Sequence, residues 1–201
     1  SREPIDFDWL KKVDLDVAIE VESFAKESFL ADTGHFHVVL QSGLLSVSPA
    51  DFVFPRGKLD MELRLDARDN PRLRFRAFGE NLDPWRTLNI QQEKKSFEAR
   101  LDLDVSWSTS GLSPHEMAAN SQGRIYIEME NGKISSALIK LVFADIAGWA
   151  WQKTKGQKYN DFDCGVADYH IAEGVISTEA FILEDFDAIL ITGGGTIDLG
   201  R

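Results

Sequence analysis

Few residues of this 201-residue chain have the type and spacing that metal binding or catalysis requires. His35 and His37 lie two positions apart and would share one face of a strand. Two ligands make only half of a metal site, and no third ligand stands at a recognisable spacing. His115 and His170 lack the neighbours of a catalytic triad. We therefore interpret His35 and His37 as ordinary turn or strand residues, and we expect no metal and no cofactor.

The single cysteine, Cys164, is a candidate nucleophile because the chain also has scattered histidines; Asp161, Asp163 and Asp168 lie around it in the sequence. It precedes a strand-like run, however, where a buried structural thiol is the commoner role. One cysteine also excludes an internal disulfide framework and a multi-cysteine zinc site.

Two further patterns have simpler interpretations than a catalytic site. The three glycines at residues 193–195 lack the lysine and the following helix of a phosphate-binding loop, so they predict a turn or bulge between strands. The acid pairs Asp14/Asp16 and Asp102/Asp104 are typical of a solvated strand face, whereas glycosidase carboxylates need a defined separation across a cleft. We therefore expect no catalytic residue and no enzymatic activity.

Composition limits the classes of partner. Lys and Arg number 22 and Asp and Glu 33, which gives a net charge of -11 and predicts repulsion of a polyphosphate backbone, so we expect no nucleic-acid binding. A hydrophobic content of 43% and a charged content of 27% are ordinary for a folded domain. The most apolar stretch, residues 136–152, is interrupted by Lys140 and Asp145 and does not predict a membrane span.

The dominant pattern along the chain is an alternation of apolar and polar residues with period two, clearest in residues 13–22, 59–66 and 101–108. Successive side chains of a strand point to opposite faces, so each run predicts a strand with one apolar and one polar face. Such strands are typical of antiparallel sheets. With the shorter runs we count roughly ten candidate strands.

Turn and helix signals separate these runs. Residues 114–120 predict a short helix with Ser113 as N-cap and Pro114 at its first position, and residues 136–153 predict a long helix that is apolar nearly all round. Residues 82–88 suggest a further helical turn. Tight turns are predicted at Gln41-Ser42-Gly43, Asp69-Asn70-Pro71, Asn131-Gly132 and Glu173-Gly174.

The apolar faces are too extensive for this one long helix. A helix of residues 136–153 spans about 27 Å and covers two or three strands spaced about 4.8 Å apart. The uncovered remainder, which we predict to be mainly aliphatic with few aromatics, must pack on a second sheet or line a groove for an apolar ligand. Composition alone favours the sandwich, and the groove remains as the alternative.

The C-terminal stretch, residues 159–200, resembles the C-terminal region of the AsmA-like family of bacterial envelope proteins. That region carries a Phe-x-Cys strand, a strand–Gly–strand hairpin and a Gly-x-Gly-x-Ile-Asp-Leu ending. Residues 5–24 and 123–134 are similar to the family's alternating strands and Gly-turn segment, whereas residues 184–187 are more acidic than its usual turn. The matching residues are Phe162, Cys164, Ile171, Gly174, Val175, Leu183, Gly193, Gly195, Ile197, Asp198 and Leu199.

The resemblance implies a long twisted β-sheet with an apolar concave side, located in the periplasm and tethered to the inner membrane by an N-terminal helix. It also implies a role in outer-membrane biogenesis and phospholipid movement. We accordingly expect residues 1–201 to form a single AsmA-like C-terminal β domain, excised from a longer membrane-anchored protein. The expected partners are phospholipid or another acyl-chain lipid, and envelope proteins.

Together these observations predict a mainly β fold, a large twisted antiparallel sheet that is groove-like or sandwich-like, with one long helix and one or two short ones. The predicted function is lipid binding and transfer; the alternatives are a scaffold that modulates outer-membrane protein assembly and a hydrolase of envelope polymers. The residues predicted to form a lipid-contacting apolar wall are Leu15, Val17, Leu59, Leu63, Leu101, Leu103 and Val105.

Overall fold

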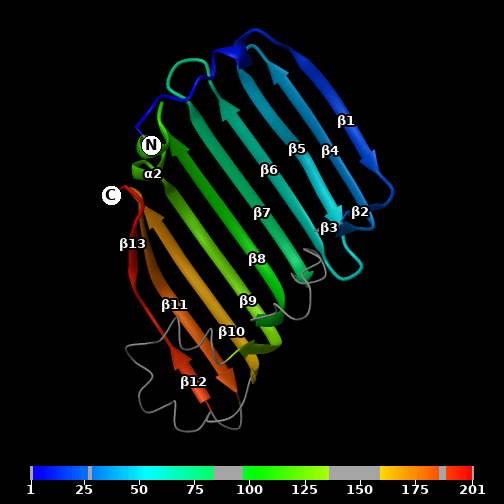
Figure 1. Cartoon of the computed structure of the whole chain (residues 1–201), viewed down its shortest axis with the longest axis vertical. Coiled ribbons are helices and arrows are strands. Elements are labelled where there is room, and N and C mark those ends of the chain that lie inside the picture. The colour runs from blue at the N-terminus through cyan, green and yellow to red at the C-terminus, as the bar shows by residue number, and fades with distance from the viewer. Residues whose placement is uncertain (1, 27–28, 84–96, 136–158, 186–188, 201) are drawn as a thin grey trace.

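The computed structural model of the chain describes residues 2–26, 29–83, 97–135, 159–185 and 189–200. Most of them belong to one large antiparallel sheet (Figure 1). Its strands are β1 (Leu15–Val21), β4 (Thr33–Gln41), β5 (Leu44–Val53), β6 (Lys58–Asp66), β7 (Arg72–Leu82), β8 (Phe97–Ser110), β9 (Gln122–Ser135), β10 (Tyr159–Ala172), β11 (Val175–Asp185), β12 (Ile189–Thr192) and β13 (Thr196–Asp198).

The sheet is a meander in which neighbours in space are neighbours in sequence. The order is β1-β4-β5-β6-β7-β8-β9-β10-β11-β12, and every described pairing is antiparallel. Strand β13 pairs with β11 farther along the edge that β12 occupies. A separate two-stranded sheet joins β2 (Phe24–Lys26) to β3 (Phe29–Ala31). Ten strands at about 4.8 Å spacing make a surface roughly 43 Å wide.

The turn predictions are mostly confirmed. Ser42 and Gly43 have φ of 48° and 80°, and Glu173 and Gly174 have φ of 49° and 74°. Each pair forms a two-residue turn, between β4 and β5 and between β10 and β11, with the positive φ at both positions that type I′ hairpins require. The predicted Asp69-Asn70-Pro71 turn joins β6 to β7. The glycines at 193–195 connect β12 to β13 along one edge of β11, as predicted.

The predicted hairpin at Asn131-Gly132 is wrong. Strand β9 runs through both residues, and the register against β8 shifts between Glu98 and Arg100, where β9 carries one extra residue. Asn131 adopts φ 48° at this bulge. A Cβ on Gly132 would overlap the ring of Phe162, so this glycine makes room for an aromatic side chain on β10 instead of turning the chain.

The short helix is confirmed as α2 (Pro114–Ala119). Its N-cap is Ser113, whose Oγ accepts a hydrogen bond of 3.2 Å from the Glu116 amide, and Glu116 Oε2 accepts one of 2.8 Å from the Leu112 amide. A short 3₁₀ helix, η1 (Asp8–Lys11), precedes β1. The predicted helix at residues 136–153 lies outside the described residues, and the turn suggested at 82–88 begins inside strand β7.

The predicted fold class, mainly β with a large antiparallel sheet, is confirmed. Among the two alternatives left open, the described residues show an open, groove-like sheet; the only other sheet they contain is the small β2–β3 pair. None of the helices in the described residues is long and apolar enough to cross a membrane.

Candidate functional site

The strand register places most of the apolar residues on one side of the sheet, which we call the apolar face; Val39 and Phe78 are among those on the other side. One row of cross-strand partners runs Val17, Val38, Val47, Leu63, Phe75 and Trp107 from β1 to β8. The next row runs Ile19, Phe36, Ala50, Met61, Ala77, Val105, Ile125 and Tyr169 from β1 to β10. Residues that face each other across antiparallel strands project to the same side, so the rows form one continuous surface.

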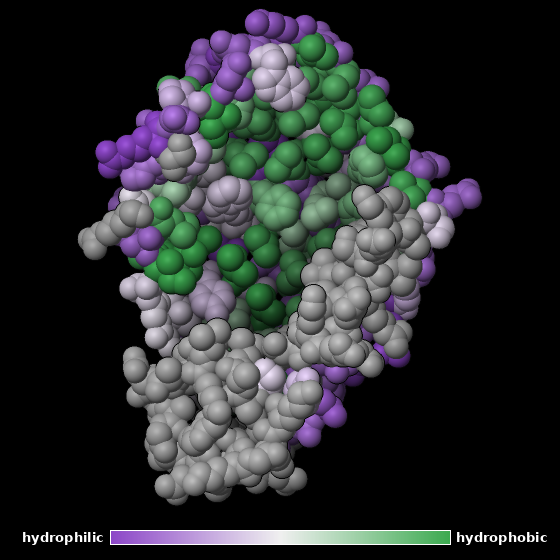
Figure 2. Space-filling view, in the orientation of Figure 1, coloured by the Kyte–Doolittle hydropathy of each residue, from purple (hydrophilic) through white to green (hydrophobic). Residues whose placement is uncertain are grey.

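Figure 2 shows this surface as a broad hydrophobic area with hydrophilic side chains along its upper and left margins. The alternation noticed in the sequence is thus in phase from strand to strand. A slip of one residue in any pairing would have moved a strand's apolar set to the other face.

All seven residues of the predicted wall lie on the apolar face. Leu15 and Val17 come from β1, and Leu59 and Leu63 from β6. Leu101, Leu103 and Val105 come from β8. The structure divides them into two groups, because some pack against buried clusters at the ends of the strands and the others do not.

One end of the apolar face is closed by the segment that precedes β1 and by α2. Leu10 of η1 is buried with Leu40 and Ala67, and Leu15 and Leu65 pack against this cluster. The Ile5 amide donates a hydrogen bond of 2.8 Å to the Leu112 carbonyl, which ties the N-terminal segment to the loop before α2. Helix α2 is joined to β8 by a hydrogen bond from the buried Thr109 hydroxyl to the Met117 carbonyl.

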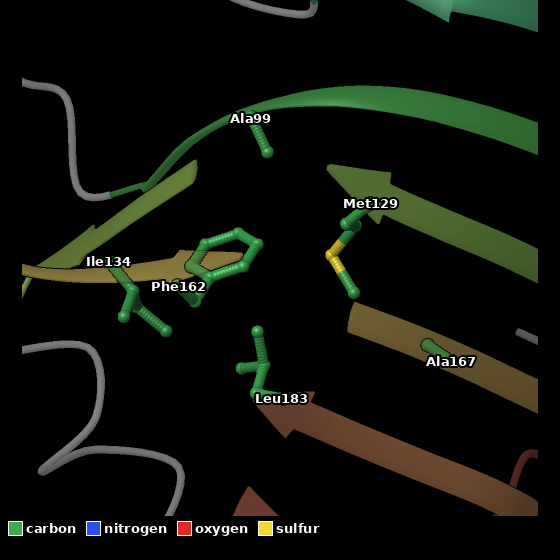
Figure 3. Close-up of a cluster of buried hydrophobic side chains, with 6 residues drawn as sticks. All are labelled: Ala99, Met129, Ile134, Phe162, Ala167 and Leu183. Atoms are coloured by element: carbon green, nitrogen blue, oxygen red, sulfur yellow. The ribbon is translucent and has the colours of Figure 1, made fainter. Parts of the chain in front are cut away.

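The other end of the strands carries two buried clusters. Ala31 of β3 packs with Phe54 and Leu82, and the wall residues Leu59, Leu101 and Leu103 lie against them. On β8 to β11, Phe162 is the centre of a second cluster (Figure 3). Its other members are Ala99, Met129, Ile134, Ala167 and Leu183.

Between these ends lies a region that we call the central rows, made of Val17, Ile19, Phe36, Val38, Val47, Met61, Leu63, Phe75, Val105, Trp107 and Ile125. None of them belongs to a buried cluster of the described residues. Val17 and Ile19 are 41% and 37% exposed, and the others are half-buried. Of the seven predicted wall residues, Val17, Leu63 and Val105 therefore lie in the central rows.

The central rows are less aliphatic than predicted. The sequence suggested few aromatics, but Phe36, Phe75 and Trp107 lie in these rows, and Phe52 and Tyr169 lie elsewhere on the same face. The stacked rings of Phe36 and Phe52 have centroids 6.4 Å apart. Of these aromatic residues, Trp107 stands in the alternating run of residues 101–108, whereas the other four stand outside the three clearest runs, where alternation is hard to recognise without the register of the neighbouring strand.

The opposite side, the polar face, carries the charges. The acid pairs lie there exposed, as predicted: Asp14 accepts a hydrogen bond from the Ser42 amide and Asp102 accepts one from the Asn81 amide. His37 Nε2 lies 2.6 Å from Asp16 Oδ1. In the part of the chain that the structure describes, no three His, Cys, Asp or Glu side chains are grouped to hold a metal ion.

Cys164 and Asp168 lie apart on the polar face. Cys164 is half-buried, rather than buried as its strand-like context suggested, and its Sγ lies 4.0 Å from Glu184 Oε2. Asp168 accepts bonds of 2.8 and 2.6 Å from the Arg124 guanidinium, which hold the pKa of that carboxyl below its usual value. Lys133 Nζ lies 3.6 Å from Asp161 Oδ1. The strand register does not place a histidine of the described residues opposite Cys164, so it shows no pairing of this thiol with a base.

Comparison with known proteins identifies the family. The family model described as "AsmA family" matches residues 1–181, most of the chain. The chain belongs to the AsmA family. This confirms the resemblance seen in the sequence and associates the chain with proteins of the bacterial envelope. No curated protein and no solved structure matches it.

Proposed function

We propose that this AsmA-family domain binds the acyl chains of phospholipid, or of another acyl-chain lipid, along the central rows of its apolar face. In this proposal it contributes to lipid transfer in outer-membrane biogenesis, is located in the periplasm, is tethered to the inner membrane in the full-length protein, and acts without catalysis. The observation that supports it is the continuity of half-exposed apolar side chains across the strands between two closed ends.

The energetics favour such a ligand. Each CH₂ group removed from water gains about 0.8 kcal/mol, so a 16-carbon tail gains roughly 12 kcal/mol before entropic losses. The central rows offer interchangeable aliphatic and aromatic contacts, without a buried polar group to fix a head group at one position. A surface of this kind binds different chains with similar affinity and allows them to slide.

The proposal is tested by purifying the domain without detergent, extracting it with organic solvent and identifying lipids by mass spectrometry. We expect phospholipid at a reproducible ratio to protein. A folded protein that carries no lipid, and takes none up from vesicles, would contradict the proposal.

A matched pair of variants on β5 locates the binding surface. Val47 lies in the central rows, and its neighbour Ser46 points to the polar face, where it pairs in register with Arg64. We expect Val47→Glu to lower bound lipid at least about tenfold, equivalent to about 1.4 kcal/mol, and Ser46→Glu to leave it unchanged. Leu63→Glu, on the adjacent strand, should behave like Val47→Glu.

The scaffold alternative has one observation in its favour. Strand β1 pairs with β4 on one side only, and among the described residues no strand covers its other edge. An unpaired strand edge can add a strand from a partner protein. Capture of an envelope protein by a lipid-free domain, unaffected by Val47→Glu, would favour this alternative.

A further inference from the structure

A group of arginines on the polar face is the most conspicuous feature that the proposed lipid site does not use. Arg72, Arg74 and Arg76 alternate along β7 and therefore project to the same side, about 7 Å apart. Within the described residues, none of the three makes an ion pair or a side-chain hydrogen bond, although Asp66 lies opposite Arg72 and Glu62 lies opposite Arg76 in register. The chain has a net charge of -11, so three neighbouring arginines on one face without an ion pair are unexpected and suggest that they bind an anion.

Arg74 and Arg76 border a hollow on the polar face of about 630 Å³. The strand register brings Arg74 and Arg76 of β7 to the hydroxyls of Ser108 and Ser106 on β8. Arg124 of β9 lies beyond Ser106 and faces His170 of β10. The polar side chains at this hollow are thus mainly guanidinium, hydroxyl and imidazole groups, all of which can donate hydrogen bonds. Phe75 and Trp107, which the register assigns to the apolar face, also border it.

Arg124 is held in place by its neighbours. Two hydrogen bonds fix its guanidinium to the Asp168 carboxylate, and it also lies over the Tyr126 ring, 5.4 Å from the centroid. Asp168 is paired with Arg124, so Arg74 and Arg76 remain as the two arginines of the hollow that make no ion pair, with the Glu62 carboxylate opposite Arg76 in register. A phosphate monoester carries about -1.5 to -2 charges at pH 7, which matches these two arginines.

We propose that this hollow binds a phosphate group, with the guanidiniums of Arg74 and Arg76 as its main ligands and the hydroxyls of Ser106 and Ser108 as additional donors. Arginine suits this role because its planar fork donates paired hydrogen bonds to phosphate oxygens. The hollow lies on the opposite side of the sheet from the central rows. Phosphate binding is therefore independent of acyl-chain binding, and each can fail without the other.

The phosphate can come from a soluble compound or from a lipid head group at a membrane surface. Isothermal titration calorimetry with inorganic phosphate and pyrophosphate measures the first source. Co-sedimentation with vesicles of phosphatidylglycerol, against vesicles of phosphatidylcholine as the neutral control, measures the second. Binding of either probe that weakens as salt is raised supports the proposal, because solvent-exposed charges are screened.

Variants distinguish binding of the probe in the hollow from its non-specific attraction to positive charge elsewhere on the protein. We expect Arg74→Ala/Arg76→Ala to weaken binding of the effective probe at least about tenfold, and Arg74→Lys/Arg76→Lys to restore part of it. The control Arg56→Ala/Arg100→Ala removes two exposed arginines that do not line the hollow, and should bind like the wild type. The proposal is overturned if the wild type binds neither probe, or if both double alanine variants weaken binding equally. Val47→Glu should leave pyrophosphate binding unchanged.

Discussion

The closed ends and the central rows of the apolar face are built from the same residue types but differ in how they are packed. Phe162, at one end, is 5% exposed and is surrounded by five other buried side chains. Phe75, in the central rows, is half-buried and belongs to no buried cluster of the described residues. This difference in packing indicates that the buried clusters at the ends stabilise the sheet, whereas the partly exposed central rows are available to a ligand.

The largest predicted effect compares these two phenylalanines. Phe162→Ala should lower the free energy of unfolding by about 3–5 kcal/mol, because it empties a packed cluster. Phe75→Ala removes a half-buried ring and should cost roughly 1–2 kcal/mol. Urea unfolding followed by circular dichroism measures both. Equal losses would show that the central rows are packed as tightly as the ends.

Two glycine substitutions test the packing at Phe162 by adding a methyl group instead of removing the ring. Gly132→Ala introduces a Cβ that overlaps the Phe162 ring and should cost about 1–3 kcal/mol by overpacking. Gly194→Ala is the control, because nothing lies within 4 Å of the added Cβ, and it should change stability by less than about 0.5 kcal/mol. If Gly132→Ala unfolds at the wild-type urea concentration, Gly132 is not what makes room for that ring.

The cap of α2 tests the end that this helix helps to close. Ser113→Ala removes the acceptor of the Glu116 amide and should cost about 1 kcal/mol, whereas Ser113→Thr keeps a hydroxyl acceptor at this buried position and should cost less. Amide hydrogen exchange should show faster exchange in residues 114–119 for the alanine variant alone. Unchanged protection in both variants would mean that packing on β8, and not the cap, holds α2.

The smallest predicted effect concerns the ion pair of the polar face. The pKa of Asp168 is lowered by its hydrogen bonds from Arg124, so the pair contributes stability at neutral pH. That contribution is fully present above the unfolded-state pKa of about 3.9 and is lost as pH falls through the lower folded-state value. Wild type and Arg124→Gln should therefore differ in urea midpoint at pH 6 and converge on acidification. If the difference in urea midpoint between the two proteins grows as the pH falls, the Arg124–Asp168 ion pair is not the source of the stabilisation.

The strands and their shared apolar face could be predicted because the alternation of apolar and polar residues is visible in the local sequence and directly sets which face each side chain occupies. The sequence could not separate Val17, Leu63 and Val105 from Leu59, Leu101 and Leu103. That distinction depends on which distant segments, such as Ala31 and Leu82, fold onto each position. The error at Asn131-Gly132 has a similar origin, because the partner that required a glycine, Phe162, lies on the next strand. Likewise, the sequence did not predict the hollow, because Arg74 and Arg76 of β7 and Arg124 of β9 are brought together only by the strand order.

The central claim is tested most directly by an environment-sensitive fluorophore on two adjacent residues with opposite orientations. In a Cys164→Ser background, one variant carries the label at Leu63→Cys in the central rows and the other at Arg64→Cys on the polar face. When vesicles of phosphatidylcholine, the neutral lipid, are added, the emission of the label at position 63 should shift to the blue as acyl chains cover it, and the emission at position 64 should stay unchanged. An equal response at both positions, or none at 63, would contradict the account.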